Sequence, residues 1–465
     1  MTARALPATD VLGLALDRAT GGRPIPGNRV HLLYDGPEIY ASALEALAAA
    51  QRWIHFDNYI IRADRTGRRF ADALIERSRA GVHVRVLTDW LGSAGTPRHY
   101  WERLRREGIE VRHFRPLRFI DLAANVVRNH RKLIVVDGRL AFVGGFCIGD
   151  EWAGDPARRR QPWRESGVEI EGPAAAALDA AFAHIWAHTG AALPGGEQSG
   201  SAEAAGECPV RVVAGVPGRD RVFRMMDLIL AASVSRFWVT DAYFLAPRRF
   251  FQSLIDAAQA GVDVRILVPG TSDLPVLRNL TRFGYRSLLR GGVRIFEWAG
   301  PMLHAKTVVA DSRWVRIGSS NLNPSSLFGN WELDVLIDDD QVANEMEGRF
   351  RSDLQRSAEV LRRPILPGAS LGGVHPTALA IQRTAEQPAM HRPGLQERKR
   401  QSIVLFWTLV GTARLATFGP LALAFLATGA MFILLPRPMA AIFGALFMWI
   451  ALVAGVHAFR RTDRG

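Results

Sequence analysis

Apolar residues along the first 360 positions follow two alternating patterns. Short segments rich in valine and isoleucine, such as those within residues 80–89 and 132–136, are separated by longer segments that carry no such run. Short apolar runs of this kind predict buried strands, and the longer segments predict helices. Because strands that alternate with helices build a sheet covered by helices, the pattern predicts a layered α/β fold.

This succession of elements occurs twice. In each half a strand ends in a tyrosine, a helix follows, then a strand after Ala-Gly-Val, a second helix and two further strands. The offset between matching segments drifts from 184 to 174 residues, as loops of unequal length allow. Two copies of this size predict a duplicated domain rather than a solenoid. The matching segments are His55–Arg62 with Val239–Ala246, Ala80–Asp89 with Ala260–Gly270, and Gly108–Phe114 with Gly292–Trp298.

Composition predicts the boundaries of these halves. Residues 188–207 are rich in glycine, alanine and serine, which is typical of a linker, and residues 363–401 resemble a second one. We therefore expect an N-terminal extension over residues 1–27, a first half over residues 28–187 and a second half over residues 208–362.

The C-terminal region, residues 402–465, is far more apolar. Residues 415–435 and 439–459 are each 21 residues long without a charge, and each is long enough to cross a bilayer as a helix. The short Pro-Arg-Pro link between them predicts a tight hairpin, and the basic residues at its outer ends place those ends in the cytoplasm. The alternative is a buried hairpin of a soluble core. The apolar residues 402–413 leave open where the first span begins.

Charge and cysteine content narrow the classes of partner. The formal net charge of +13 favours anionic partners, either phospholipid headgroups or nucleic acid, and does not choose between them. Two cysteines, Cys147 and Cys208, cannot build a disulfide framework or a cysteine-rich zinc site. Asp10 and Asp17 interrupt the most apolar part of the first 27 residues, so we expect no signal peptide there.

One short motif occurs at the same place in each half. A histidine is followed two residues later by a lysine and, after four more residues, by an aspartate. On a strand the histidine and the lysine face the same side, whereas the aspartate has the opposite parity and begins a turn. The aspartates therefore either shape a turn or support a site from behind. The candidate catalytic residues are the six motif residues: His130, Lys132 and Asp137 in the first half and His304, Lys306 and Asp311 in the second.

Small and acidic residues follow each motif. Gly145 and Ser319 stand where a returning strand ends in small residues, which allows close approach to a ligand. Glu165 and Glu332 each come before a further strand. A buried carboxylate there would bind one imidazole nitrogen, fix its tautomer and raise its basicity. The alternative for each glutamate is a solvated charge at the end of a strand.

Two histidines and two lysines together suit phosphodiester exchange. One neutral imidazole can attack phosphorus, and the other can protonate the leaving oxygen and later deprotonate the incoming alcohol. Two lysines would stabilise the charge that develops on the non-bridging oxygens. This division of roles needs neither a metal nor another cofactor, and we expect neither.

These residues resemble the phospholipase D superfamily and, within it, bacterial cardiolipin synthases. The resemblance covers roughly residues 27–361 and includes the segments Asp57–Leu74, Asn129–Gly145, Met302–Leu327 and Asn330–Val335. It implies two phospholipase D-like α/β/α sandwich halves that share one active site, followed here by the transmembrane hairpin. The familiar members often carry their membrane spans at the N-terminus instead.

The resemblance also implies roles for individual residues. His130 is expected to be the nucleophile, His304 the general acid and base, and Asn321 a phosphate ligand. Cys147 stands where the first half of the family usually has an asparagine, and a thiol is a weaker hydrogen-bonding group. The expected reaction joins two molecules of phosphatidylglycerol into cardiolipin and glycerol at the bacterial inner membrane. The oligomeric state is left open.

Three other functions compete with this interpretation. A nuclease of the same superfamily would use arginine runs such as Arg158–Arg160 on a phosphate backbone. The apolar C-terminus favours a lipid substrate instead, so we expect no nucleic-acid partner. A binding protein with a decayed site is disfavoured because both motifs are intact. A hydrolytic phospholipase would use the same catalytic residues, with water in place of the alcohol.

Overall fold

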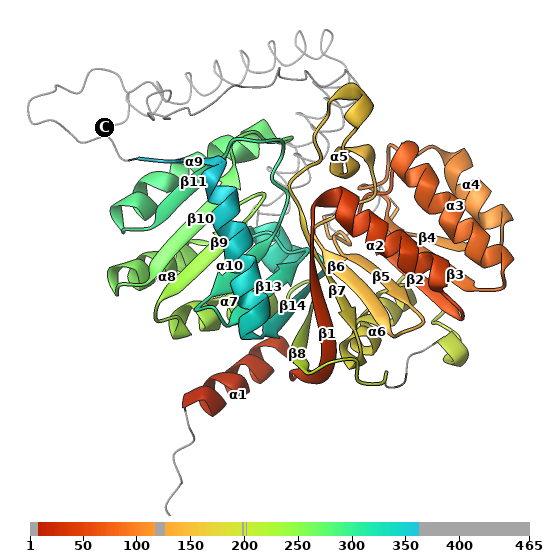
Figure 1. Cartoon of the computed structure of the whole chain (residues 1–465), viewed down its shortest axis with the longest axis horizontal. Helices are drawn as coiled ribbons and strands as arrows, with labels where there is room; N and C mark the ends of the chain where they lie inside the picture. The colour runs from red at the N-terminus through yellow and green to blue at the C-terminus, as the bar shows by residue number, and fades with distance from the viewer. Residues whose placement is uncertain (1–7, 117–125, 198–199, 201, 362–465) are drawn as a thin grey trace, which may run out of the picture. The chain divides into compact units, whose positions relative to one another are not determined.

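A single mixed sheet runs through both halves of the chain (Figure 1). The computed structural model describes residues 8–361, apart from 117–125, 198–199 and 201. Within these residues the sheet has fifteen strands in the order β15-β11-β10-β9-β12-β13-β14-β8-β1-β7-β6-β5-β2-β3-β4. The predicted α/β class and its duplication are confirmed, because the strands on either side of the β8–β1 pair follow the same order.

The first half repeats the predicted succession of strands and helices. Helix α3 shows how local sequence forms these elements. Asp64 caps its N-terminus by accepting a hydrogen bond from the Gly67 amide at 2.9 Å, and Phe70 and Leu74 are buried on one face. The elements are β1 (Ile25–Tyr34), α2 (Asp35–Ala49), β2 (Trp53–Asn58), α3 (Arg65–Arg79), β3 (His83–Asp89), α4 (Arg98–Arg106), β4 (Glu110–Phe114), β5 (Lys132–Val136), β6 (Leu140–Gly144), α5 (Asp150–Ala153), β7 (Ser166–Glu171) and α6 (Pro173–Ala187), with short 3-10 turns at Pro156–Arg158 and Gly195–Glu197.

The second half follows with matching elements. They are β8 (Cys208–Gly215), α7 (Arg221–Ala232), β9 (Arg236–Thr240), α8 (Arg248–Gln259), β10 (Asp263–Pro269), α9 (Pro275–Arg290), β11 (Arg294–Trp298), β12 (Thr307–Ala310), β13 (Trp314–Gly318), the short helical turn η3 (Ser325–Gly329), β14 (Glu332–Asp338), α10 (Asp340–Gln355) and β15 (Ser357–Glu359).

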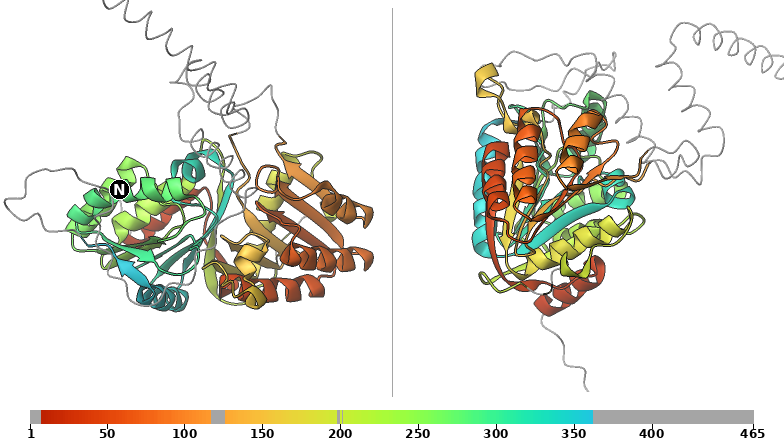
Figure 2. Two further views of the ribbon diagram at one scale, coloured as in Figure 1. Left: turned by 90° about the horizontal axis from the view of Figure 1, so that it is seen from above. Right: turned by 90° about the vertical axis from the view of Figure 1, so that its right-hand side faces the viewer.

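The two halves join edge to edge through β1 and β8. These strands are antiparallel, with Ile25 opposite Val210 and Asn28 opposite Cys208. One hydrophobic cluster spans the join and includes Leu32 and Val335 from opposite halves, together with residues of α6 and α10. Two further clusters lie under the other helices, one in each half. Helices therefore cover both faces of the sheet (Figure 2), which is the predicted α/β/α arrangement.

Two segments expected to lie outside the halves pack against them. Helix α1 (Ala8–Thr20), within the predicted N-terminal extension, buries Leu16 in the core of the second half, and its Asp17 pairs with Arg211 at 2.5 Å. Glu197 of the predicted linker is buried and forms an ion pair with Arg85 of β3. Residues 1–27 were expected to be an extension and residues 188–207 a linker, and the sequence carried no signal of the residues against which these segments pack.

The predicted transmembrane hairpin lies outside the described residues, as does the predicted linker over residues 363–401. Among the helices that the structure describes, none combines the length and apolar character needed to cross a bilayer.

Candidate active site

The two histidine–lysine motifs meet where the halves join, because each is hydrogen bonded to the opposite half. The His130 amide donates to the Trp331 carbonyl at 2.9 Å, and the Trp331 amide donates to the Arg128 carbonyl at 2.9 Å. The second motif repeats this arrangement, with His304 and Met302 bonded to Arg164 at 2.8 and 2.9 Å. These backbone bridges hold both histidines at one pocket.

Each histidine is supported by a glutamate from the other half. Nδ1 of His130 donates to the Glu332 carboxylate at 3.0 Å, and Nδ1 of His304 donates to Glu165 at 2.7 Å. Both carboxylates are fully buried. Both glutamates contact an imidazole, which is the first of the two interpretations that the sequence allowed. Nothing in the sequence indicated that each glutamate would contact the histidine of the other half.

Burial keeps both imidazoles neutral at pH 7. It lowers the pKa of His130, and it lowers that of His304 to about 3, with the nearby Lys306 charge acting in the same direction. Burial alone would raise the pKa of Glu165, but the facing His304 and its hydrogen bond outweigh burial and hold that pKa below its usual range. Each pair is therefore a neutral imidazole on an ionised carboxylate, with Nε2 left unprotonated as a nucleophile or base.

Gly145 and Ser319 occupy equivalent places behind the two glutamates. The Ser319 hydroxyl donates to Glu332 at 2.5 Å. In the first half a Cβ at Gly145 would lie 2.5 Å from Oε1 of Glu165, so only glycine leaves room for that carboxylate. Both predicted supporting residues thus contact the glutamates rather than the pocket.

Each motif lysine contacts the backbone of the histidine in its own motif. Lys132 and Lys306 are fully buried, and each ammonium donates to the carbonyl of the histidine two residues before it. Burial lowers the pKa of Lys132, and it lowers that of Lys306 to about 8. Tyr59 and Tyr243 lie over these ammonium groups, with ring centroids 5.1 and 5.9 Å away.

The structure separates the motif aspartates from the histidines and lysines, although the sequence analysis grouped all six as catalytic. Asp137 lies at the far end of β5 and accepts hydrogen bonds from the amides of residues 51–53 at 2.7–2.9 Å. Asp311 does the same for residues 234–236. Asp137 and Gly138 have φ values of 54° and 67°, as a two-residue hairpin turn requires. The aspartates therefore shape the turn, which is the other interpretation that their parity allowed.

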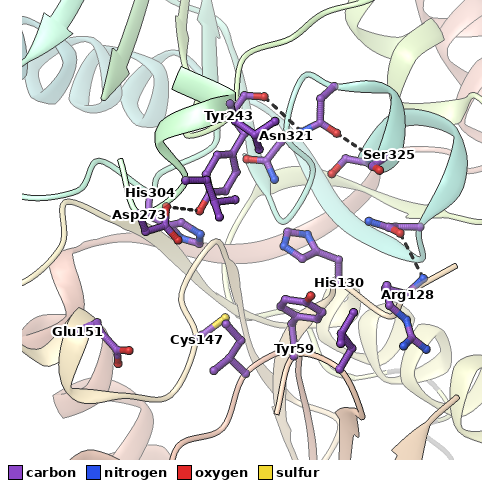
Figure 3. Close-up of a pocket in the computed structure, with 18 of the residues that line it drawn as sticks. Tyr59, Arg128, His130, Cys147, Glu151, Tyr243, Asp273, His304, Asn321 and Ser325 are labelled. Carbon is purple, nitrogen blue, oxygen red and sulfur yellow. Dashed lines mark hydrogen bonds between the residues drawn. The ribbon is translucent and has the colours of Figure 1, made fainter. Parts of the chain in front are cut away.

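The pocket itself is lined by both imidazoles and by residues of both halves (Figure 3). Tyr59 lies edge-on to His130, with centroids 4.9 Å apart, and Tyr243 lies edge-on to His304 at 6.0 Å. Asn321 lines the pocket, is 3% exposed, and leaves its Oδ1 without a hydrogen-bond partner in the part of the chain that the structure describes. Its placement agrees with the predicted phosphate ligand, and Cys147 occupies the equivalent place in the first half.

The two sides of the pocket differ chemically despite the duplication. His304 faces Trp152 and Trp163, with centroids 5.5 and 5.6 Å away, whereas the position equivalent to Trp163 on the His130 side is Asn330. Arg128 lines the His130 side, and its counterpart in the second half is Met302. One side is therefore aromatic and the other polar and cationic.

Arg128 and several aromatic residues were missed by the sequence analysis. The tyrosines carried a usable signal, because each follows an equivalent strand of its half, Tyr59 after β2 and Tyr243 after β9. Trp163 and Arg128 carried none, because they break the symmetry between the halves. Arg128 is 5% exposed, lies 3.4 Å from the Asp89 carboxylate, and keeps one buried guanidinium nitrogen without a partner among the described residues. In the described ranges, no three His, Cys, Asp or Glu side chains converge to hold a metal ion.

Comparison with known proteins places this geometry in a family. A family model described as "Cardiolipin synthase, PLD-like domain" matches residues 43–186 and 225–354. Cardiolipin synthase A of Pseudomonas aeruginosa is 32% identical over 361 residues, which span 76% of this chain and 74% of that protein. Cardiolipin synthase 2 of Bacillus anthracis is 33% identical over 334 residues, or 70% of this chain and 65% of the relative.

A solved structure shares the fold. The crystal structure of phosphatidylserine synthase from Haemophilus influenzae Rd KW20 superposes with a TM-score of 0.60 at 15% identity, over 75% of this chain and 92% of that one. At that identity the likeness concerns the fold alone.

Proposed function

Because this chain belongs to the cardiolipin synthase family with phospholipase D-like domains, we propose that it is a phosphatidyltransferase that converts two molecules of phosphatidylglycerol into cardiolipin and glycerol. The observation that carries the proposal is the pair of neutral imidazoles, each held by a buried carboxylate from the opposite half, at one pocket. Such a pair supplies both a nucleophile and a proton carrier for one phosphodiester.

The first step forms a phosphohistidine. Nε2 of His130 attacks the phosphorus of the donor lipid, the bond from phosphorus to the headgroup glycerol oxygen breaks, and His304 delivers a proton to that oxygen. The pKa of His304 is about 3 in the protein alone, so His304 must gain its proton in the complex with the lipid. The anionic phosphodiester promotes this, because a negative charge beside an imidazole favours its protonated form.

The second step reverses these roles. His304, now neutral, takes a proton from the terminal hydroxyl of a second phosphatidylglycerol. That oxygen attacks phosphorus, and the bond between phosphorus and His130 breaks. Glu332 and Glu165 keep the Nδ1 protons in place through both steps, so Nε2 remains the reacting nitrogen of each ring.

Lys132, Lys306 and Asn321 would stabilise the non-bridging oxygens. Both ammonium groups are buried and each donates to the carbonyl of its own motif histidine, so their charge acts in a medium of low local dielectric on an oxyanion that develops at the histidines. Asn321, a residue of the second half, lines the pocket, so its side-chain amide can hydrogen bond to the phosphate. Cys147 offers a weaker partner on the opposite side.

Transfer rather than hydrolysis depends on which molecule reaches the phosphohistidine. The aromatic wall formed by Trp152, Trp163 and Tyr243 surrounds His304, the residue that activates the acceptor. Apolar rings around the proton acceptor disfavour a loosely held water and favour an alcohol positioned by its own lipid. This supports the transferase over the hydrolytic phospholipase.

We further propose that the chain is anchored in the bacterial inner membrane by helices over residues 415–435 and 439–459, with the catalytic halves in the cytoplasm. The support is their uncharged length and their basic flanks. A reporter fused after residue 465, active only in the cytoplasm, would test this orientation.

The reaction is tested with the full-length protein in detergent, phosphatidylglycerol and a metal chelator, with products followed by mass spectrometry. We expect cardiolipin and glycerol from the wild type and neither from His130→Ala. Phosphatidic acid as the main product would mean that water is the acceptor. Absence of lipid turnover together with cleavage of single-stranded DNA would overturn the lipid assignment.

A further inference from the structure

Helix α9 connects the pocket wall to an exposed apolar surface. Leu274 and Leu277, at its start, line the pocket. The adjacent Val276 is 45% exposed, and Phe283, seven residues further on, is 80% exposed. Residues seven apart lie on the same face of a helix, so the two apolar side chains form one stripe that begins beside the pocket.

Basic side chains continue this stripe. Arg290 lies seven residues beyond Phe283, and Arg286 flanks it; both are exposed and form no ion pair within the described part of the chain. The neighbouring Arg282, by contrast, turns inward and binds Glu297 through two hydrogen bonds at 2.6 and 2.8 Å. The outer face of α9 is thus apolar near the pocket and positively charged at its far end, without acidic residues.

We propose that this face of α9, defined by Val276, Phe283, Arg286 and Arg290, rests on the surface of an anionic phospholipid bilayer and brings the pocket to its lipid substrate. The inference rests on the proposed function. Helices that lie at a membrane surface usually insert apolar side chains into the headgroup region, while their arginines pair with lipid phosphates. A bilayer, rather than a protein, is the occupant that the adjoining pocket requires, because a phosphatidyl group reaches it from a membrane.

The location of α9 supports this choice. In Figure 1 α9 lies in the upper part of the view, as does α5, whose Glu151 and Trp152 also line the pocket, whereas α1 lies in the lower part. Helix α1 also exposes two apolar side chains, Val11 and Leu14, at 54% and 42%. Both helices therefore expose two apolar side chains, but of the two only α9 adjoins the pocket, which makes α1 a control.

The first test measures membrane contact without measuring catalysis. The full-length chain carrying Cys147→Ser, Cys208→Ser and Phe283→Cys is labelled with a nitrobenzoxadiazole fluorophore and reconstituted in vesicles of phosphatidylcholine with or without phosphatidylglycerol. We expect emission to rise and to be quenched by nitroxide lipids when phosphatidylglycerol is present. The same label at Leu14→Cys should show neither change. Equal behaviour of the two labels would overturn the proposal.

The second test separates membrane presentation from chemistry. Phe283→Ser combined with Val276→Ser should lower turnover of long-chain phosphatidylglycerol in vesicles by roughly three- to tenfold. Turnover of a short-chain phosphatidylglycerol, supplied as dissolved monomers, should not change. Val11→Ser with Leu14→Ser should leave both rates unchanged. An equal loss on both substrates would place the effect inside the site and contradict the inference. A wild type inactive on both would count against the proposed function, while the fluorescence test still decides the inference.

Discussion

The Glu332 carboxylate accepts a hydrogen bond from Nδ1 of His130 at 3.0 Å, although 202 positions separate the two residues and they belong to different halves of the duplication. Glu165 holds His304 in the same way at 2.7 Å. Each half therefore supplies one of the two imidazoles and the carboxylate that orients the other.

Replacing either glutamate by glutamine should impair catalysis without unfolding the protein. An amide can still accept from Nδ1, but it no longer stabilises the positive charge that the imidazole carries after it takes up a proton or bonds to phosphorus. We expect Glu165→Gln and Glu332→Gln each to lower kcat by roughly 10- to 100-fold. Cardiolipin formation and thermal melting check this. The exposed Glu345→Gln serves as the control, and an unchanged kcat in both site variants would contradict the assigned role.

Substitution of a motif aspartate should mainly lower the stability of the protein, whereas substitution of a motif lysine should mainly lower its activity. Asp137→Ala removes the acceptor for three backbone amides, so it should lower the free energy of unfolding by about 1–2 kcal/mol and largely preserve kcat. Lys132→Met should instead abolish most turnover. Urea denaturation and activity assays on both variants separate the two effects. A catalytic role for Asp137 would appear as a large loss of kcat at unchanged stability.

The aromatic wall around His304 should control the ratio of transfer to hydrolysis. Trp163→Asn places on this side the residue that the other half carries as Asn330, and we expect it to admit water and increase the share of phosphatidic acid. Trp163→Phe should keep the wild-type ratio because it keeps an apolar ring. Asn330→Ala is the matched control on the opposite side. Products can be quantified by mass spectrometry in 18O-labelled water. An unchanged ratio of cardiolipin to phosphatidic acid in Trp163→Asn would refute the idea that the aromatic wall excludes water.

The neutral histidines should make the protein less stable in acid. His304 has a pKa of about 3 when folded and about 6.5 when unfolded, so between these values the unfolded chain binds more protons. The free energy of unfolding should therefore fall as the pH decreases from 6.5. Glu165, whose pKa is also depressed, adds a fall of the same sign below about 4.5. Denaturation at pH 7, 6 and 5 should show a smaller slope for His304→Asn, and an identical slope would contradict this.

The sequence predicted those features that repeat or that depend on local chemistry. The α/β succession, the duplication and the Asp137–Gly138 turn follow from periodicity and from residues suited to their backbone angles. The two glutamates were found because each precedes a strand after a motif. Their exchange between halves could not be predicted, since it depends on the edge-to-edge pairing of β1 with β8. Trp163 and Arg128 could not be predicted, because a comparison of the two halves identifies only positions that they share, and these two residues differ between the halves.

The join between β1 and β8 also bears on how such a site can evolve. Two identical chains paired across the same edge would bring two identical motifs together, and any substitution would appear on both sides of the pocket at once. Because both copies lie in one chain here, Cys147 can differ from Asn321, and Trp163 from Asn330. Neither copy can be lost, since each orients the other's histidine. The duplication thus keeps the two halves dependent on each other while allowing the two sides of the pocket to differ. This suits the proposed transfer, in which two phosphatidylglycerol molecules take different roles as donor and acceptor.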